Sequence, residues 1–217
     1  PSSAIAWLLV IFFLSGIGIL LFIVIGSPKL SKKRRRDQVL VDNMISKATA
    51  NYENELKHLS KEERSRVQSI VDLNRSLGKL PARAGNSFKI LPEYNKAIDN
   101  IVAEIKKAKE FVHIEYFILA LDETTQPIFD AMEGAVRRGV KVRLMFDGMG
   151  FRAYPRRKEM KKLLTDIGVE WHIMLPPTFN LKNYNRIDLR NHRKILVVDD
   201  RVAYIGSQNL IDRTYHR

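Results

Sequence analysis

The sequence predicts an α/β protein in three parts: a transmembrane helix at residues 1–28, a basic collar and helical connector at 29–80, and a compact domain at 81–217. Three observations support this division. An uncharged apolar run opens the chain, a charged helix-favouring stretch follows, and strand and helix patterns alternate after Pro81. The length of 217 residues leaves room for one domain of ordinary size beside the first two parts.

The composition excludes several classes of protein. With 45% hydrophobic and 28% charged residues the chain can bury a core, which excludes a wholly disordered protein. There is no cysteine, which excludes disulfides and thiolate metal sites, and no metal or other cofactor is expected because the histidines are scattered. The net charge of +13 favours a polyanionic partner, either nucleic acid or an acidic lipid surface. The histidines are His58, His113, His172, His192 and His216.

Residues 4–25 carry no charge and would form a helix about 33 Å long, enough to span a bilayer. A cleavable signal peptide is the alternative, but the run is too long and no basic segment precedes it. The basic collar that follows predicts a cytoplasmic location for the rest of the chain and attraction to anionic headgroups. Because the chain opens with Pro1, we expect both ends to be truncated. The collar consists of Lys29, Lys32, Lys33, Arg34, Arg35 and Arg36.

The connector at residues 37–80 is polar and rich in helix-favouring residues. Ser60, followed three positions later by Glu63, predicts a capping box at the start of a helix. A coiled-coil dimer is the alternative, but the apolar positions keep no heptad over several turns. We therefore expect a juxtamembrane helical connector.

Beyond Pro81 the periodicity predicts the order βαβαβ, which implies right-handed crossovers and a mixed, mostly parallel sheet flanked by helices. Ligands usually bind where such strands end. Asp147 lies at one such end, where an ordinary turn aspartate and a role in a site are equally consistent with the sequence. The predicted helices are 94–109, 126–138 and 156–166, and the predicted strands are 111–119, 140–147 and 169–175.

The last segment predicts two further strands, at 194–198 and 202–205, joined by a turn at 199–201. Side chains alternate along a strand, so His192 and Lys194 should point the same way, and Ser207 and Asn209 should share a face. These groups suit a phosphodiester: an imidazole can attack phosphorus, an ammonium offsets charge, and hydroxyl and amide groups orient the oxygens. Asp199 fits a supporting role in the turn, bonded to backbone donors.

The pattern His192-x-Lys194-x4-Asp199-x6-Gly206-Ser207-x-Asn209 resembles the HxKxxxxD motif and GSxN tail of the phospholipase D superfamily. Six specified residues in register would arise by chance in such a chain on the order of once in 10⁵ or less. Within the superfamily, the segments 137–150 and 190–200 are most similar to the first catalytic half of bacterial cardiolipin synthases. The resemblance implies a phospholipase D-like fold for residues 81–217.

The resemblance also implies a reaction, in which a phosphatidyl group passes from one phosphatidylglycerol to another through a phosphohistidine, at the cytoplasmic side of a bacterial cell membrane. His192, Lys194 and Asp199 would be the catalytic residues, and Ser207 and Asn209 would bind substrate. Family members carry two such motifs and this chain carries one, so a missing C-terminal half or a second copy of the chain is the expected partner.

Other functions remain open at this point. A phospholipase D-type hydrolase or a membrane-tethered nuclease could assemble from two single-motif chains, and a noncatalytic scaffold could use the basic charge alone to bind anionic lipid. Nucleic acid is the less expected substrate because of the apolar N-terminal run and the resemblance at residues 113–118. We expect the loop at 176–191 to line the contact with the second half, where the sheet should expose an apolar face.

Overall fold

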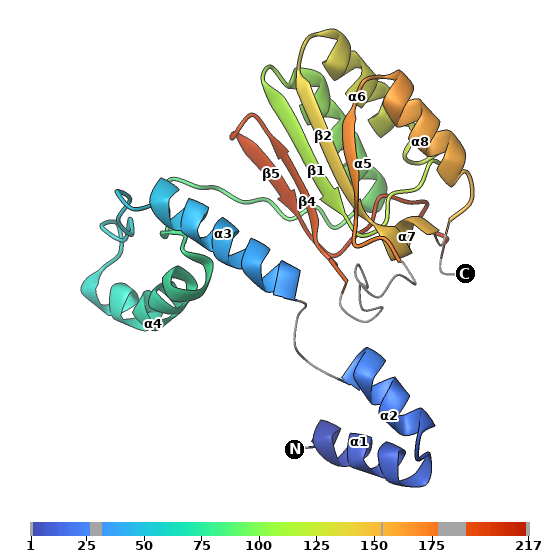
Figure 1. Cartoon of the computed structure of the whole chain (residues 1–217). Helices are drawn as coiled ribbons and strands as arrows, with labels where there is room; N and C mark the ends of the chain where they lie inside the picture. Colours follow the sequence, from blue (N-terminus) through green and yellow to red (C-terminus); the bar gives the residue numbers. More distant parts are fainter. Residues whose placement is uncertain (1, 27–31, 153, 178–189, 216–217) are drawn as a thin grey trace. The chain divides into compact units, whose positions relative to one another are not determined.

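The structure is a computed structural model that describes residues 2–26, 32–152, 154–177 and 190–215. The chain forms two compact units, Pro1–Ile90 and Leu91–Arg217. Figure 1 shows the helices and strands of both units.

The prediction of a transmembrane helix at residues 1–28 is wrong. The apolar run instead forms helix α1 (Ser2–Phe13), helix α2 (Ile17–Leu21) and a π-helical turn η1 (Phe22–Gly26). None of the helices in the described ranges is both long enough and apolar enough to cross a membrane.

Two glycines explain the break in the apolar run. Gly16 has a φ of 83°, in the left-handed region that glycine adopts without steric cost, so the chain turns there instead of continuing one helix. Gly18 then packs so closely on α1 that a Cβ atom would lie 2.6 Å from the Val10 carbonyl oxygen. The rings of Trp7 and Phe22 pack edge to face with centroids 5.5 Å apart. The run therefore folds back on itself as a short hairpin.

The connector contains two helices, α3 (Lys32–Ala48) and α4 (Lys61–Gly78). The capping box at the start of α4 is confirmed, because Ser60 Oγ accepts a hydrogen bond from Glu63 N at 3.2 Å and Glu63 Oε2 accepts one from Ser60 N at 2.8 Å. Arg75 of α4 donates to the Thr49 carbonyl at 3.1 Å, which ties the two helices together. Lys29 of the collar lies outside the described residues.

The second unit is a five-stranded sheet in the order β3-β2-β1-β4-β5. β1 pairs in parallel with β2, and β2 with β3, whereas β4 is antiparallel to both β1 and β5. The predicted mixed sheet flanked by helices is thus confirmed, but the sheet is not mostly parallel, because two of its four strand pairs are antiparallel. The short helix α7 was not predicted. The elements are α5 (Tyr94–Lys107), β1 (Phe111–Tyr116), α6 (Gln126–Arg137), β2 (Lys141–Asp147), α7 (Gly148–Arg152), α8 (Arg157–Asp166), β3 (Glu170–Met174), β4 (Lys194–Val198) and β5 (Val202–Ile205).

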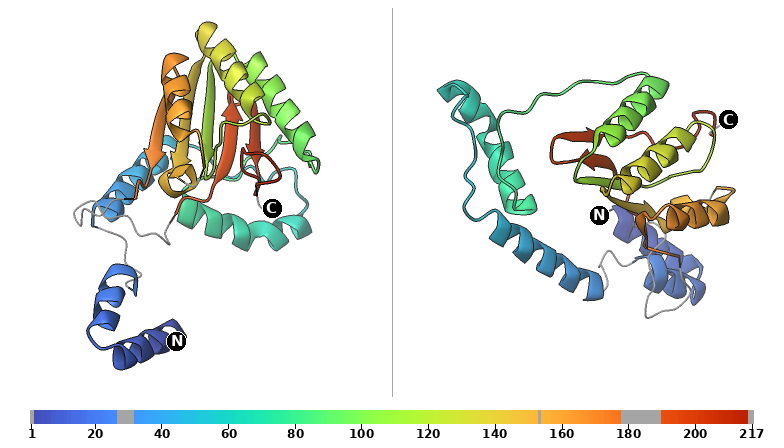
Figure 2. Two further views of the ribbon diagram at one scale, coloured as in Figure 1. Left: turned by 90° about the vertical axis from the view of Figure 1, so that its right-hand side faces the viewer. Right: turned by 90° about the horizontal axis from the view of Figure 1, so that it is seen from above.

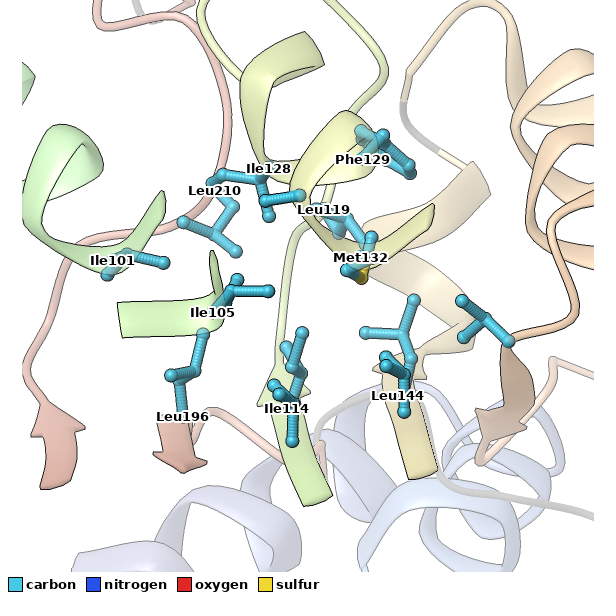
Figure 3. Close-up of a cluster of buried hydrophobic side chains, with 14 of the residues drawn as sticks. Ile101, Ile105, Ile114, Leu119, Ile128, Phe129, Met132, Leu144, Leu196 and Leu210 are labelled. Atoms are coloured by element: carbon cyan, nitrogen blue, oxygen red, sulfur yellow. The ribbon is translucent and has the colours of Figure 1, made fainter. Parts of the chain in front are cut away.

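The core of this unit lies between one face of the sheet and helices α5, α6 and α8. Both crossovers step along the sheet in the same direction, from β1 to β2 to β3, so right-handed connections place α6 and α8 on the same face. Alternate strand residues such as Ile114, Leu144 and Leu196 point into the core and meet Ile105 and Met132 from the helices. Figure 3 shows these side chains gathered between the strands and the helices, and Figure 2 gives two further views of the layers.

The opposite face of the sheet is more open. Its residues are partly or fully exposed, as the alternating burial pattern of β1, β2 and β5 shows. Met145 of β2 is an exposed apolar residue on this face, on the same strand as Arg143, which forms a surface ion pair with Glu170 of β3 at 2.8 Å. Ile205 of β5 is a second exposed apolar residue, at the other edge of the sheet. The face is therefore a mixture of apolar and charged groups.

Candidate active site

His192 and Lys194 lie at the edge of the sheet where the parallel strands end. β4 runs antiparallel to β1 and its first residue, Lys194, pairs with Tyr116, the last residue of β1. His192 precedes the strand by two residues and is exposed to solvent. Both residues therefore lie at the carboxyl ends of the parallel strands, where ligands usually bind in such sheets.

Phe117 brings the imidazole and the ammonium together. It directly follows β1, and its ring lies 4.5 Å from the His192 ring, centroid to centroid. The Lys194 Nζ atom lies 5.3 Å from the centroid of the same ring, a cation–π contact. Sequence reasoning missed Phe117, because the predicted strand at 111–119 includes this residue, whereas β1 ends at Tyr116.

Lys194 is a buried cation. Its side chain is on the core side of β4 and the residue is only 3% exposed. Nζ donates a hydrogen bond to the His192 carbonyl oxygen at 2.8 Å, which fixes the ammonium next to the histidine. Burial lowers the pKa of Lys194, because the low-dielectric surroundings disfavour the charged form. Because the ammonium is poorly hydrated, it would attract an anionic ligand more strongly than an exposed lysine would.

A buried ion pair holds the backbone that leads into His192. Asp147, the last residue of β2, is completely buried, and Arg190 donates to its Oδ1 through Nε at 3.0 Å and Nη2 at 2.6 Å. Asp147 Oδ2 also accepts from Asn191 N at 3.3 Å. The sequence left Asp147 undecided between turn and site, and the structure shows that it anchors residues 190–191, directly before His192.

Asn191 makes a second link between this segment and the sheet. Its side-chain amide donates to the Glu115 carboxylate of β1, and Arg193 Nη1 lies 3.7 Å from the same carboxylate. The residues on both sides of His192 are therefore held by β1 or β2, while its own side chain faces solvent. No sequence signal pairs Arg190 or Asn191 with these strands, because their partners lie dozens of residues away.

Ser207 and Asn209 occupy different environments. Gly206 N donates to the Lys194 carbonyl at 3.3 Å, so the exposed Ser207 follows at the same end of the sheet as His192. Asn209 is buried, and its amide oxygen accepts from Ile118 N at 3.3 Å while its amide nitrogen donates to the Tyr215 hydroxyl at 3.1 Å. Asn209 thus ties the segment after β5 to the end of β1.

Asp199 lies at the other end of β4, about 17 Å of extended strand away from Lys194. Its carboxylate accepts hydrogen bonds from three consecutive backbone N–H groups, on Lys109 at 2.8 Å, Glu110 at 2.9 Å and Phe111 at 2.8 Å. Burial alone would raise the pKa of Asp199, but these donors outweigh it and the pKa is lowered. The motif aspartate therefore joins the β4–β5 turn to the start of β1.

Two further sequence predictions concern this region. Within the described residues, no group of three or more histidine, cysteine or acidic side chains could hold a metal ion. Most of the loop that was expected to line a contact with a second half, residues 178–189 with Phe179, Tyr184 and Arg186, lies outside the described residues.

Comparisons with known proteins agree with the motif. Residues 101–217 match the family described as "Cardiolipin synthase, PLD-like domain". Over 99% of this chain, cardiolipin synthase A from Shigella boydii serotype 4 (strain Sb227) and from Escherichia coli (strain K12 / DH10B) are each 28% identical. The chain spans 44% of the length of these relatives. Among solved structures, Nuc from Salmonella typhimurium, a phospholipase D family member, is 18% identical, with a TM-score of 0.41 over 52% of this chain and 64% of that one.

Proposed function

Because the chain belongs to the family of phospholipase D-like domains of cardiolipin synthase, we propose that it is one half of a phosphatidyltransferase that moves phosphatidyl groups between phosphatidylglycerol molecules. The observation that carries the proposal is the exposed imidazole of His192, set beside the buried ammonium of Lys194 on a shared aromatic ring. The proposed substrates are lipids, so the reaction takes place at a membrane surface.

In the first proposed step, a ring nitrogen of His192 attacks the phosphorus of phosphatidylglycerol. A P–N bond forms, the P–O bond to the headgroup glycerol breaks, and glycerol leaves with a proton from a second histidine. In the second step that histidine takes a proton from the hydroxyl of an acceptor phosphatidylglycerol, whose oxygen attacks phosphorus and breaks the P–N bond. The products are cardiolipin, glycerol and free enzyme.

The other motif residues are assigned by their positions. Lys194 offsets the charge that builds up on the nonbridging oxygens, since its ammonium is fixed 2.8 Å from the His192 carbonyl. Ser207, exposed at the same end of the sheet, donates to one of those oxygens. Asn209 and Asp199 act through the backbone that they hold, because their polar atoms are occupied by Ile118, Tyr215 and the start of β1.

The second histidine must come from another copy of the motif, because these 217 residues contain one His-x-Lys sequence. We propose that this chain supplies one half-site and that either further polypeptide or a second copy of the chain supplies the other. A dependence of specific activity on protein concentration would indicate assembly of two copies.

The experiment that tests the proposal incubates the assembled enzyme, in which both half-sites are present, with phosphatidylglycerol labelled in its phosphate. We expect acid-labile label on the wild-type protein, with release of glycerol, and none on His192→Ala. His58→Ala is the matched control, because His58 is an exposed histidine of the other unit and its removal should leave labelling unchanged. Lys194→Ala should slow labelling without abolishing it, by about 10²-fold or more.

Parallel assays separate the alternatives. Production of phosphatidic acid without cardiolipin would indicate a hydrolase, and cleavage of single-stranded DNA without lipid turnover would indicate a nuclease. Equal labelling of His192→Ala and wild type would end the proposed mechanism, whatever the products.

A further inference from the structure

A basic hollow lies on the surface of the second unit, between the end of α7 and the start of α8. It is open to solvent and its volume is about 500 Å³. Four of its six lining residues are cationic and none is acidic. The lining residues are Arg152, Tyr154, Pro155, Arg156, Arg157 and Lys158.

The positive charge of the basic hollow is largely uncompensated. Glu159 pairs with Arg156, through Nε at 2.9 Å and Nη2 at 2.7 Å, and so neutralises one of the four cations. No ion pair engages Arg152, Arg157 or Lys158 within the part of the chain that the structure describes. Three like charges held together without a carboxylate repel one another, and a bound anion would remove that repulsion.

The basic hollow adjoins the reaction centre through a small apolar cluster. Tyr154, which lines the hollow, packs against a buried cluster of Ile118, Ala120 and Ile211, and Phe117 packs against the same cluster. The Phe117 ring in turn contacts His192. Gly150 of α7 also lies directly against the Phe117 backbone, where a side chain would have no room. The hollow and the His192 ring are therefore both positioned by contacts with Phe117 and its cluster. None of the residues that line the hollow belongs to the motif.

We infer that the basic hollow binds the phosphate of an anionic phospholipid headgroup that is not the one reacting at His192. Guanidinium groups match phosphate oxygens in geometry, and the Arg and Lys stems with Tyr154 and Pro155 offer apolar surface for the carbons of the headgroup. The choice of a phospholipid over another phosphate compound rests on the proposed function. A headgroup held here would keep this edge of the sheet at the lipid surface that supplies the substrates.

The test titrates the full 217-residue chain with dihexanoyl phosphatidylglycerol below its micelle-forming concentration, followed by NMR. We expect shifts at residues 152–158, and affinity at least about tenfold above that for dihexanoyl phosphatidylcholine, which has no net charge. Arg152→Gln with Lys158→Gln should lower that affinity about tenfold or more. The control, Lys106→Gln with Lys141→Gln, removes two exposed lysines near the opposite edge of the sheet and should leave affinity unchanged.

Several outcomes would overturn the inference. The first is an equal loss of affinity for phosphatidylglycerol in the two double variants, and the second is equal affinity for phosphatidylglycerol and phosphatidylcholine. The third is an affinity for inorganic phosphate that equals the affinity for phosphatidylglycerol, and the fourth is tighter binding of a short single-stranded DNA than of phosphatidylglycerol. His192→Ala distinguishes the two proposals, because it should abolish phosphohistidine formation and leave binding at residues 152–158 intact. Loss of that binding in His192→Ala would mean that a single site explains both results, and the basic hollow would have no role of its own.

Discussion

At the scale of single residues, the carboxylate of Asp147 has the largest expected effect on stability. It is completely buried and bonded to Arg190, whose side chain is itself only 9% exposed. We predict that Asp147→Ala destabilises the protein by about 3–5 kcal/mol, because a buried guanidinium loses its counter-charge. The measurement is urea unfolding of the variant beside Glu170→Gln, which breaks the exposed pair with Arg143 and should cost at most about 1 kcal/mol. Similar losses in the two variants would contradict the prediction.

Asp199 should act on stability in a pH-dependent way. Asparagine tolerates the positive φ of 51° at position 199, so Asp199→Asn should not strain the backbone. Its side-chain amide N–H group would, however, face a backbone N–H group, and two donors cannot form a hydrogen bond. We therefore expect the free energy of unfolding to fall by about 1 kcal/mol at pH 7. Because the pKa of Asp199 is lowered in the folded state, the carboxylate stabilises the fold at pH values above its ordinary pKa of 3.8. This stabilisation is lost as the pH falls through the lower pKa of the folded state.

The check for Asp199 is a series of thermal unfolding curves between pH 7 and pH 2.5. The difference between wild type and Asp199→Asn should shrink toward the acid end. Asp200→Asn removes the neighbouring turn carboxylate, for which no backbone hydrogen bond of this kind occurs in the described residues, and should follow the wild type closely. A difference that grows on acidification would reverse the argument.

At the scale of elements, α7 controls the position of Phe117 through a glycine. A Cβ atom at Gly150 would overlap the Phe117 carbonyl oxygen, so Gly150→Ala must displace α7 or the end of β1. We predict a destabilisation of about 1–3 kcal/mol and slower labelling of His192, whose ring rests on Phe117. Gly134→Ala is the control, since its new Cβ would make only an ordinary contact with Arg138 inside α6 and should stabilise by up to about 1 kcal/mol. Unfolding curves and labelling rates of the two variants decide the matter.

The elements also show which features the sequence could predict. Strands β1 to β5 and helices α5, α6 and α8 were predictable because each has a clear period and ends at a glycine, a turn or a charge cluster. Helix α7 has five residues, too few to show a period. The prediction of one long N-terminal helix failed because it rested on the number of consecutive apolar residues. Hydropathy does not register that the chain turns at Gly16, whose φ is positive, or that Gly18 packs closely on α1.

The residues of the candidate site also divide into those that the sequence could predict and those that it could not. His192 and Lys194 could be predicted because the motif lies within one short segment and its chemistry depends on residue type. Phe117, Asp147 and Arg190 could not, because their contacts join β1, β2 and the segment before β4, and a single sequence contains no record of pairing between distant residues. The same limit applies to Asn209, whose engagement with Ile118 depends on how the chain returns to the end of β1.

At the scale of the whole molecule, the second unit has a core of its own. The main hydrophobic cluster draws every buried member from residues between Ile98 and Leu210, and none from the first unit. A domain with its own core can fold alone. We therefore predict that a polypeptide of residues 91–217 folds cooperatively and keeps the hydrogen-exchange protection that β1, β2 and β4 have in the whole chain.

A shorter polypeptide provides the matched comparison. One that starts at Lys109 retains all five strands but lacks α5, and with it Ile98, Ile101 and Ile105, which cover the sheet beside Leu196. Exposing the core face of β1 and β4 to water should prevent cooperative folding, because three large apolar side chains contribute about 1.5–3 kcal/mol each and a domain of this size is stable by only about 5–15 kcal/mol. Circular dichroism melts and exchange rates of the two polypeptides test this. If both fold equally well, α5 is dispensable; if neither folds, the second unit depends on the first, and the two units are a single folding domain.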